Sequence, residues 1–320
     1  MSRGRGPTRR ELAMLAAAGL FAGRGVTASA AGARPGVVGT AALAADGLDR
    51  PAARRAIGLS IERALGVERA AAGLGALFSP ADTVGIKLSC LGAPRLSPRV
   101  ALVESLVDLL ADAGVLRSRI LVFERSSREL ERAGFQIRRS GGPYLCYGTD
   151  NQYDSEPSTS GAIGSCFARE VSTTCTALIS FGVVKDHDLA GVSAGLKNWY
   201  GVIHNPNKYH GSNCNPYVAD VFRHPFLAGK HRLTILDGVE AQCQGGPAFY
   251  AGGLFPLGLV AASADPVAAD LWAWQVLDAE RVRRGLPTLA ADGREPAFIA
   301  TAGGYGLGVA DPARLKVVAG

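Results

Sequence analysis

TVGIKLSCLGAPRLSPRVALVESLVDLLADAGVLRSRILVFE, residues 83–124, has the pattern of a strand, a helix and a second strand. The apolar run at 83–88 is typical of a buried strand. Ser97 and Pro98 are suited to begin a helix, and Gly114 is suited to end it after Ala113. The apolar face of this helix carries Leu102, Leu106, Leu109 and Leu110. Residues 119–124 predict the next strand, so we expect a βαβ unit with parallel pairing and a right-handed crossover.

The rest of the chain repeats this order of strand and helix. A helix is predicted at 49–65 with Asp49 as its N-cap, and the Asp265–Pro266 pair predicts another that ends near Leu277. Strands are predicted at 177–184, 233–236, 257–262 and 315–318, with a final helix near 296–302 and a long irregular loop at 141–164. We therefore predict an α/β fold with a mostly parallel sheet, in which residues 31–320 form one mature domain that could have two lobes.

The first thirty residues have the features of an export signal. Arg9–Arg10 is followed by an apolar run at 12–22 and by Ala28-Ser29-Ala30, a small-residue cleavage site. This order predicts a twin-arginine signal at 1–30 that is cleaved near Ala30. We expect the twin-arginine translocation machinery to be a partner and the mature protein to be periplasmic or extracellular. The alternative is a basic N-terminus with a short surface helix.

Most of the positive charge belongs to this segment. The formal net charge is +6, and residues 1–30 contain five arginines and one glutamate, which leaves +2 for the remainder. The remainder has no basic stripe with interleaved aromatic residues, so nucleic acid is not an expected ligand. It also has no apolar stretch long enough for a transmembrane helix after cleavage.

Six cysteines are present, and none lies in a C-x-x-C pair. Compact cysteine runs hold iron–sulfur clusters and structural zinc, so neither group is expected. In an oxidising compartment the cysteines would be disulfides or buried thiols, and Cys243 is the candidate partner of Cys214.

Polar residues concentrate in SFGVVKDHDLAGVSAGLKNWYGVIHNPNKYHGSNCN, residues 180–215. Three of the five histidines lie here: His187, His204 and His210. The strand that ends near Val184 delivers Lys185 and His187 to the carboxyl edge of the sheet, where open α/β sheets bind ligands. If residues 193–200 are helical, Ser193 and Lys197 both face the start of that helix, which favours an anion.

These patterns suggest roles for individual residues. An anionic substrate or a cofactor phosphate would be held by Lys87, Lys185, Gly191, Ser193 and Asn198, and the catalytic groups would be His187, Lys197 and His204. Asp237, directly after the apolar run 233–236, could join His187 and His204 around a divalent transition metal. The alternatives are structural histidines, solvated lysines, a turn aspartate and, for Asp265, a simple helix N-cap.

The same segment carries a resemblance to a known family. Lys185-x-His187, followed by Gly191-Val192-Ser193-x-x-x-Lys197-Asn198-x-x-Gly201, resembles the central signature of the family called domain of unknown function 362. The other elements of that family also have counterparts here, in the same order. They are Ile86-Lys87, then Asp237-Gly238 with Gly245-Gly246-Pro247, then Ser263-x-Asp265-Pro266-Val267-Ala268-x-Asp270, and finally Gly306-x-Gly308. Leu88-Ser89 replaces the usual Pro-Asn. Some members carry ferredoxin-like cysteine runs, which this chain lacks, so an electron-transfer role is not implied.

A second resemblance is to nickel-pincer lactate racemases, in which a lysine and histidines hold a nucleotide-derived nickel cofactor. His187, Gly191, Ser193, Gly195 and Lys197 occupy places comparable to the H…G-Y-S-G-G-K segment of those enzymes, although the paired glycines are incomplete.

Two classes of function are compatible with these residues. We expect an enzyme of redox or isomerase type that binds a metal, or an anionic cofactor or substrate, through the Lys/His cluster. The first alternative is a non-catalytic exported protein that binds a small anionic molecule, and the second is a structural protein without such a site. The sequence has no G-x-S-x-G, H-E-x-x-H or P-loop motif, so it carries no hydrolase signature of these kinds.

Overall fold

The computed structural model describes residues 36–43, 46 and 48–320, so the predicted export signal at 1–30 lies outside the described residues. One large sheet has the order β12-β1-β11-β9-β7-β2-β3-β4, and the short strands β8 and β10 pair with β7 and β9. Its strands are β1 Gly36–Ala42, β2 Val84–Leu88, β3 Ile120–Glu124, β4 Leu145–Gly148, β7 Ala177–His187, β8 Gly191–Ser193, β9 His231–Gln242, β10 Leu254–Phe255, β11 Leu259–Ser263 and β12 Leu315–Val318. A separate two-stranded sheet joins β5 Ser158–Ser160 to β6 Ile163–Ser165.

Half of the sheet is parallel. β4, β3, β2, β7 and β9 are parallel to one another, whereas β11 is antiparallel to both β9 and β1, and the short strands β8 and β10 are antiparallel to β7 and β9. The predicted βαβ unit is confirmed, because Val84 of β2 pairs with Ile120 of β3 in parallel register across the helix α4. The prediction of an α/β fold with a mostly parallel sheet in a single domain is therefore confirmed.

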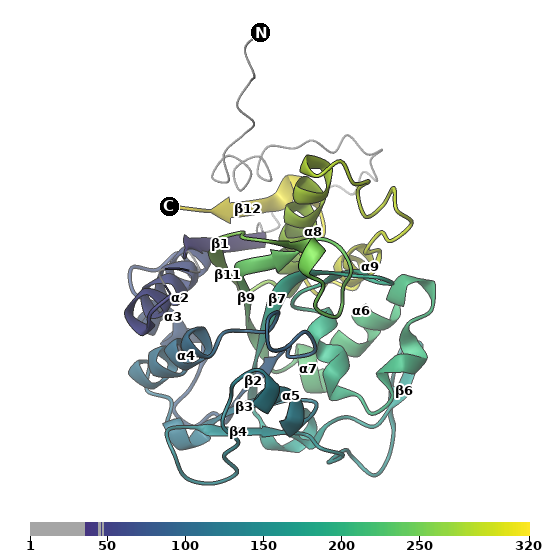
Figure 1. Cartoon of the computed structure of the whole chain (residues 1–320). Coiled ribbons are helices and arrows are strands. Elements are labelled where there is room, and N and C mark those ends of the chain that lie inside the picture. The colour runs from purple at the N-terminus through teal and green to yellow at the C-terminus, as the bar shows by residue number, and fades with distance from the viewer. Residues whose placement is uncertain (1–35, 44–45, 47) are drawn as a thin grey trace.

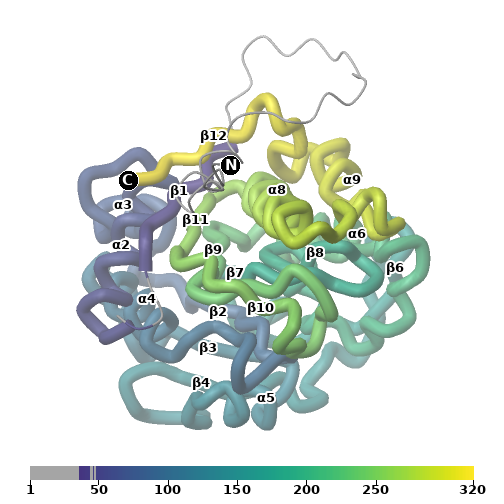
Figure 2. Tube along the Cα trace, turned by 45° about the horizontal axis from the view of Figure 1, so that its top comes forward, coloured from purple at the N-terminus to yellow at the C-terminus, as the bar shows by residue number. Residues whose placement is uncertain are grey.

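Helices cover both faces of the sheet (Figure 1). α2 Arg50–Leu65, α3 Ala70–Leu77 and α4 Val100–Asp112 lie on one face, and α6 Tyr217–Phe222, α8 Pro266–Arg283 and α9 Phe298–Gly304 lie on the other. The fully buried strand β7 serves both layers: Ile179 and Phe181 pack with the first group, and Leu178 packs with the second. Figure 2 shows β7, β9 and β10 in the middle of the molecule between these layers.

Shorter helical segments fill the connections. They are the α-helices α5 Ser127–Arg132 and α7 Pro225–Ala228, the π-helix Glu170–Thr174, and the 3₁₀ helices Arg117–Arg119, Lys197–Val202, Pro206–Tyr209, Ser212–Cys214, Ala251–Gly253 and Pro312–Arg314. No helix among residues 36–43, 46 and 48–320 combines the length and the hydropathy needed to cross a bilayer.

The predicted helix starts depend on side-chain caps, and two of them are present. The Asp49 side chain accepts from Ala52 N at 2.7 Å and begins α2. The Asp265 side chain accepts from Val267 N and Ala268 N and begins α8, which agrees with the simple N-cap reading of that residue. α4 begins at Val100 and not at Ser97. Residues 193–200 are not an α-helix, because the end of β8 is followed by a turn and the 3₁₀ helix Lys197–Val202.

The chain also contains structure that the sequence patterns did not predict. Residues 141–164 include β4, which extends the parallel sheet, and the β5–β6 pair, so the prediction of an irregular loop there is partly wrong. All six cysteines are free thiols and five are buried, so the Cys214–Cys243 disulfide is not formed and the buried-thiol alternative holds.

Candidate functional site

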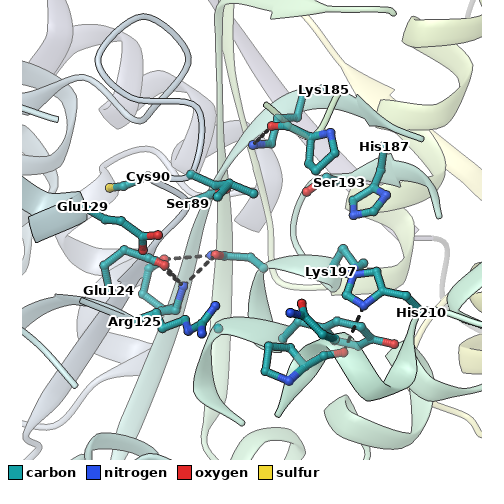
Figure 3. A pocket seen from close by; sticks show the side chains of 18 of the residues that line it. Ser89, Cys90, Glu124, Arg125, Glu129, Lys185, His187, Ser193, Lys197 and His210 are labelled. Atoms are coloured by element: carbon teal, nitrogen blue, oxygen red, sulfur yellow. Dashed lines mark hydrogen bonds and ion pairs between the residues drawn. The ribbon is translucent and has the colours of Figure 1, made fainter. Parts of the chain in front are cut away.

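A cavity of about 470 Å³ opens where β2, β3 and β7 end. Figure 3 shows the side chains that line it. From the three strand ends come Lys87, Ser89, Glu124, Arg125, Lys185 and His187, and from the end of β8 and the segment after it come Ser193, Lys197, Asn198, Tyr200, Asn207 and His210. β2 lies between β3 and β7 in the sheet. The cavity is therefore at the carboxyl edge of three adjacent parallel strands.

Lys87 is fully engaged in the wall of the cavity. Its Nζ donates to both carboxylate oxygens of Glu124, at 2.7 and 2.9 Å, to Leu88 O at 2.7 Å and to Asn198 Oδ1 at 3.1 Å. Asn198 Nδ2 donates in turn to Lys87 O and to Ser180 Oγ. These contacts satisfy the ammonium and neutralise its charge, so Lys87 and Asn198 hold the wall in shape.

Lys185 and Lys197 are in a different electrostatic position. Lys185 Nζ donates to Pro247 O at 2.9 Å, whereas Lys197 Nζ lies 3.1 Å from His210 Nε2 and 3.6 Å from the centroid of the Tyr200 ring. Burial lowers the pKa of each lysine to about 8. Within the described part of the chain, neither Nζ has a carboxylate oxygen inside 4.0 Å. Two buried ammonium groups without counter-charges are costly unless an anion joins them.

The hydrogen bonds of the two cavity histidines define their tautomers. His210 Nδ1 lies 3.0 Å from Pro206 O, a pure acceptor, so Nδ1 carries the proton and Nε2 accepts from Lys197. Its pKa is lowered, first by burial and then by Lys197. The two rings stack with centroids 5.6 Å apart.

His187 has the opposite tautomer. Its Nδ1 accepts from the backbone N–H groups of Leu189 and Ala190, at 3.1 and 3.2 Å, so the proton is on Nε2. Asp188 Oδ1 is 2.9 Å from the same nitrogen, but 63% of that side chain is exposed, so it can turn to solvent while the backbone donors remain. Burial, with Lys197 next, lowers the pKa of His187 to about 2. His187 is therefore a neutral hydrogen-bond donor at physiological pH.

Asp270 of α8 positions the turn that carries Lys197. Its carboxylate accepts from Gly195 N at 2.7 Å and from Leu196 N at 3.1 Å, and burial raises its pKa to about 7. Ser193, which lines the cavity, pairs with Lys185 across the β7–β8 ladder.

Gly191 does not line the cavity, so its predicted contact with a ligand is not supported by its position. It begins β8, directly after the turn that follows β7, with a φ of 75°, and a Cβ there would lie 2.1 Å from Arg294 O. Glycine is therefore required by the turn and by the close approach of the backbone.

His204 and Asp237 also lie away from the cavity. His204 is exposed and its ring packs edge-on against Tyr153, because the 3₁₀ helix Lys197–Val202 carries the chain to the outside. Asp237 lies within β9, which continues to Gln242, and not at a strand end. Its buried carboxylate accepts from Arg99 N at 3.0 Å and Arg99 Nη1 at 2.7 Å, tying the start of α4 to the sheet.

The predicted metal set is corrected by these positions. His187, His204 and Asp237 do not converge, and the described residues contain no group of three or more His, Cys, Asp or Glu side chains suited to a metal ion. These three residues therefore cannot bind one metal ion together.

Several cavity residues were not among the predicted site residues. Glu124 and Arg125 follow directly from the predicted strand 119–124, so the carboxyl-edge argument that indicated Lys185 also applies to them. Glu129 and Asn207 lie on local elements whose orientation no periodicity indicated. His210 takes the place in the cavity that was expected for His204.

Comparison with known proteins gives one family. The family model described as domain of unknown function (DUF362) matches residues 84–275, which include every residue that lines the cavity. No curated protein matches. A crystal structure of a Thermotoga maritima protein, a structural genomics target, aligns with a TM-score of 0.43 and 10% sequence identity over 76% of this chain and 61% of that chain.

Proposed function

The chain belongs to the DUF362 family, and we propose that it is an enzyme that binds a small anionic molecule in the cavity at the carboxyl edge of the sheet. The pair formed by Lys185 and Lys197 carries this proposal. Both ammonium groups are buried, both line one cavity, and among the described residues neither has a carboxylate partner. An anion would supply the missing counter-charge and accept the donors that remain on each Nζ.

The same geometry supports a proton-transfer reaction on that anion, as in an isomerase. Lys197, with a pKa of about 8, exchanges between ammonium and amine close to ambient pH, which suits a general acid or base. Neutral His187 presents Nε2–H and could polarise a substrate oxygen without becoming charged. Lys185 would hold the anionic group. This assignment keeps His187 and Lys197 as catalytic groups and leaves His204 out.

A non-catalytic binding protein is the second candidate, and one observation favours it. The pKa of both cavity histidines is lowered, so neither histidine changes charge near neutral pH. A site that only captures an anion needs no titrating group. The two candidates differ in whether the bound molecule is converted.

The test is a thermal-shift panel of phosphate, sulfate, pyrophosphate and simple carboxylates on the protein and on Lys185→Met, Lys197→Met and the exposed control Lys316→Met. We expect at least one anion to raise the Tm of the parent and of the control but of neither cavity variant. Equal stabilisation of all four proteins would contradict the proposal. Mass spectrometry of the bound anion after incubation separates the two candidates: a changed molecule indicates an enzyme, and an unchanged one indicates a binding protein.

We also propose export through the twin-arginine route, supported by Arg9–Arg10, the apolar run and Ala28-Ser29-Ala30 in the sequence. Replacing Arg9 and Arg10 by lysine should keep the protein in the cytoplasm at its uncleaved size. Fractionation of cells that express both forms measures this. Export of the lysine variant at the normal level would contradict the proposal.

A further inference from the structure

We infer that the ligand of this cavity is zwitterionic, with its anionic group between Lys185 and Lys197 and an amino group at the carboxylate of Glu129. The inference names the chemical class of the ligand and therefore rests on the proposed anion site. It comes from the two walls of the cavity: one carries a carboxylate that no side chain of the described residues binds, and the other carries two ammonium groups without a carboxylate partner.

Glu129 is the carboxylate without a side-chain partner on the first wall, which also carries Lys87, Glu124 and Arg125. It lies in the first turn of α5, just beyond the end of β3, is half-buried and lines the cavity. Its neighbour Glu124 is already bound by Lys87 through both oxygens. The Glu129 carboxylate, by contrast, has no hydrogen bond or ion pair with another of the described residues. After the Lys87–Glu124 pair, Glu129 is the remaining carboxylate on this wall and Arg125 is the remaining cation, and the two side chains are not paired with each other.

The nearby cation Arg125 also lines the cavity but is not paired with Glu129. Its side chain is exposed, and no oxygen of Glu129 lies within 4.0 Å of its guanidinium. Burial and then the charge of Glu124 raise the pKa of Glu129, against the opposing effect of Lys87, Arg125 and Arg132, none of which forms an ion pair with it. A ligand ammonium would form that ion pair.

Figure 3 shows Glu124, Arg125 and Glu129 on one side of the cavity and Lys185, His187, Lys197 and His210 on the other. A ligand that spans the cavity would therefore meet the unpaired carboxylate of Glu129, on the wall that also carries Arg125, at one end and two ammonium groups at the other. A dianion of the same length would place its second negative charge against Glu129, which is unfavourable. The volume of about 470 Å³ is within the range of small-molecule sites.

Calorimetric titration with matched probes tests the inference. The amino probes are β-alanine, γ-aminobutyrate and aminoethyl phosphate, the amine-free probes are propionate, butyrate and ethyl phosphate, and the dianions are succinate and glutarate. We expect at least one amino probe to bind about tenfold more tightly than its amine-free match, which is the effect of one charge-assisted contact. The dianions should bind more weakly than the amino probes.

Glu129→Gln keeps the shape of the side chain and removes its charge. This variant should lose the preference for the amino probe while still binding the amine-free anion, whereas the matched control Glu131→Gln, exposed on the same helix, should keep the preference. Lys197→Met should weaken the binding of both the amino probes and the amine-free probes.

The outcomes distinguish a failure of this inference from a failure of the proposed anion site on which it rests. If anions bind through the lysines but no amino probe exceeds its match, or Glu129→Gln retains the preference, the ligand is not zwitterionic and the anion site survives. If no probe binds, the inference is also contradicted, and the inorganic anion panel with the lysine variants decides separately on the site itself.

Discussion

At the scale of residues, the site depends on which charges are compensated inside the protein. Lys87 has Glu124, so its ammonium belongs to the wall. Lys185 and Lys197 have a carbonyl oxygen, an imidazole nitrogen and an aromatic face in place of a carboxylate. This difference could not be read from the sequence, in which all three lysines follow apolar residues. It arises from the long-range meeting of β2 with β3.

The pH dependence of anion binding should follow these lysines. Because the pKa of Lys185 and Lys197 is about 8, both are mostly charged at pH 6–7 and lose their charge as the pH rises through 8. We expect affinity for an anion to be constant below pH 7 and to fall above pH 8, by up to about tenfold per pH unit per lysine. Titrations of the parent protein between pH 6 and 10 measure this, and an affinity unchanged up to pH 10 would contradict the assignment.

The stability of the ligand-free protein should rise with pH over the range in which anion binding weakens. A lysine whose folded pKa is below its ordinary value of 10.5 makes the unfolded state bind more protons between pH 8 and 10.5, so its destabilising effect disappears over that window. Lys185→Met should therefore be more stable than the parent at pH 7, by about 1–3 kcal/mol, and the gain should shrink toward pH 10.5. Urea unfolding at pH 7 and pH 10 tests it, and a variant less stable at pH 7 would contradict it.

At the scale of elements, short irregular segments position the site that the regular elements frame. The sequence predicted β2, β3, β7 and α4 because their apolar patterns are strong, and these elements bring Lys87, Lys185 and His187 to one edge. The anion site considered for Ser193 and Lys197 depended on a helix at 193–200, where the chain instead forms the end of a strand, a turn and a 3₁₀ helix. That segment is held by Asp270, a contact between residues 75 positions apart. A local pattern contains no information on such a contact, and for the same reason His204 was expected where His210 lies.

The approach of the 3₁₀ helix Lys197–Val202 to β2 requires a glycine at 201. A Cβ on Gly201 would lie 2.6 Å from Lys87 Nζ and 2.8 Å from its Cε. Gly201→Ala should displace the ammonium from Glu124 and lower the free energy of unfolding by about 1–3 kcal/mol. Gly211→Ala is the matched control, since its added Cβ would meet nothing within 4 Å and its φ is −64°. Urea denaturation of both variants compares them, and equal stabilities would show that the Lys87 contact is not constrained at this point.

At the scale of the whole molecule, one sheet brings together a site whose residues lie between positions 87 and 247 of the chain. The α/β class and the single domain were predictable, because a chain that alternates strands and helices can form only a few topologies, most of them with a parallel sheet. The antiparallel insertion of β11 between β9 and β1 was not, because strand order depends on pairing between distant segments. β1 itself is rich in glycine and alanine and gave no strand signal. The sequence therefore indicated the sheet edge that carries the site but not the position of Glu129 on α5.

The central claim is that Lys185 and Lys197 share a bound anion. Calorimetric titration of the most stabilising anion of the panel into the parent protein, Lys197→Met and the control Lys316→Met tests it most directly. Loss of one charged hydrogen-bond donor should raise the Kd of Lys197→Met by about 10–100-fold. The Kd of the control Lys316→Met should equal that of the parent. A Kd for Lys197→Met equal to that of the parent would contradict the account.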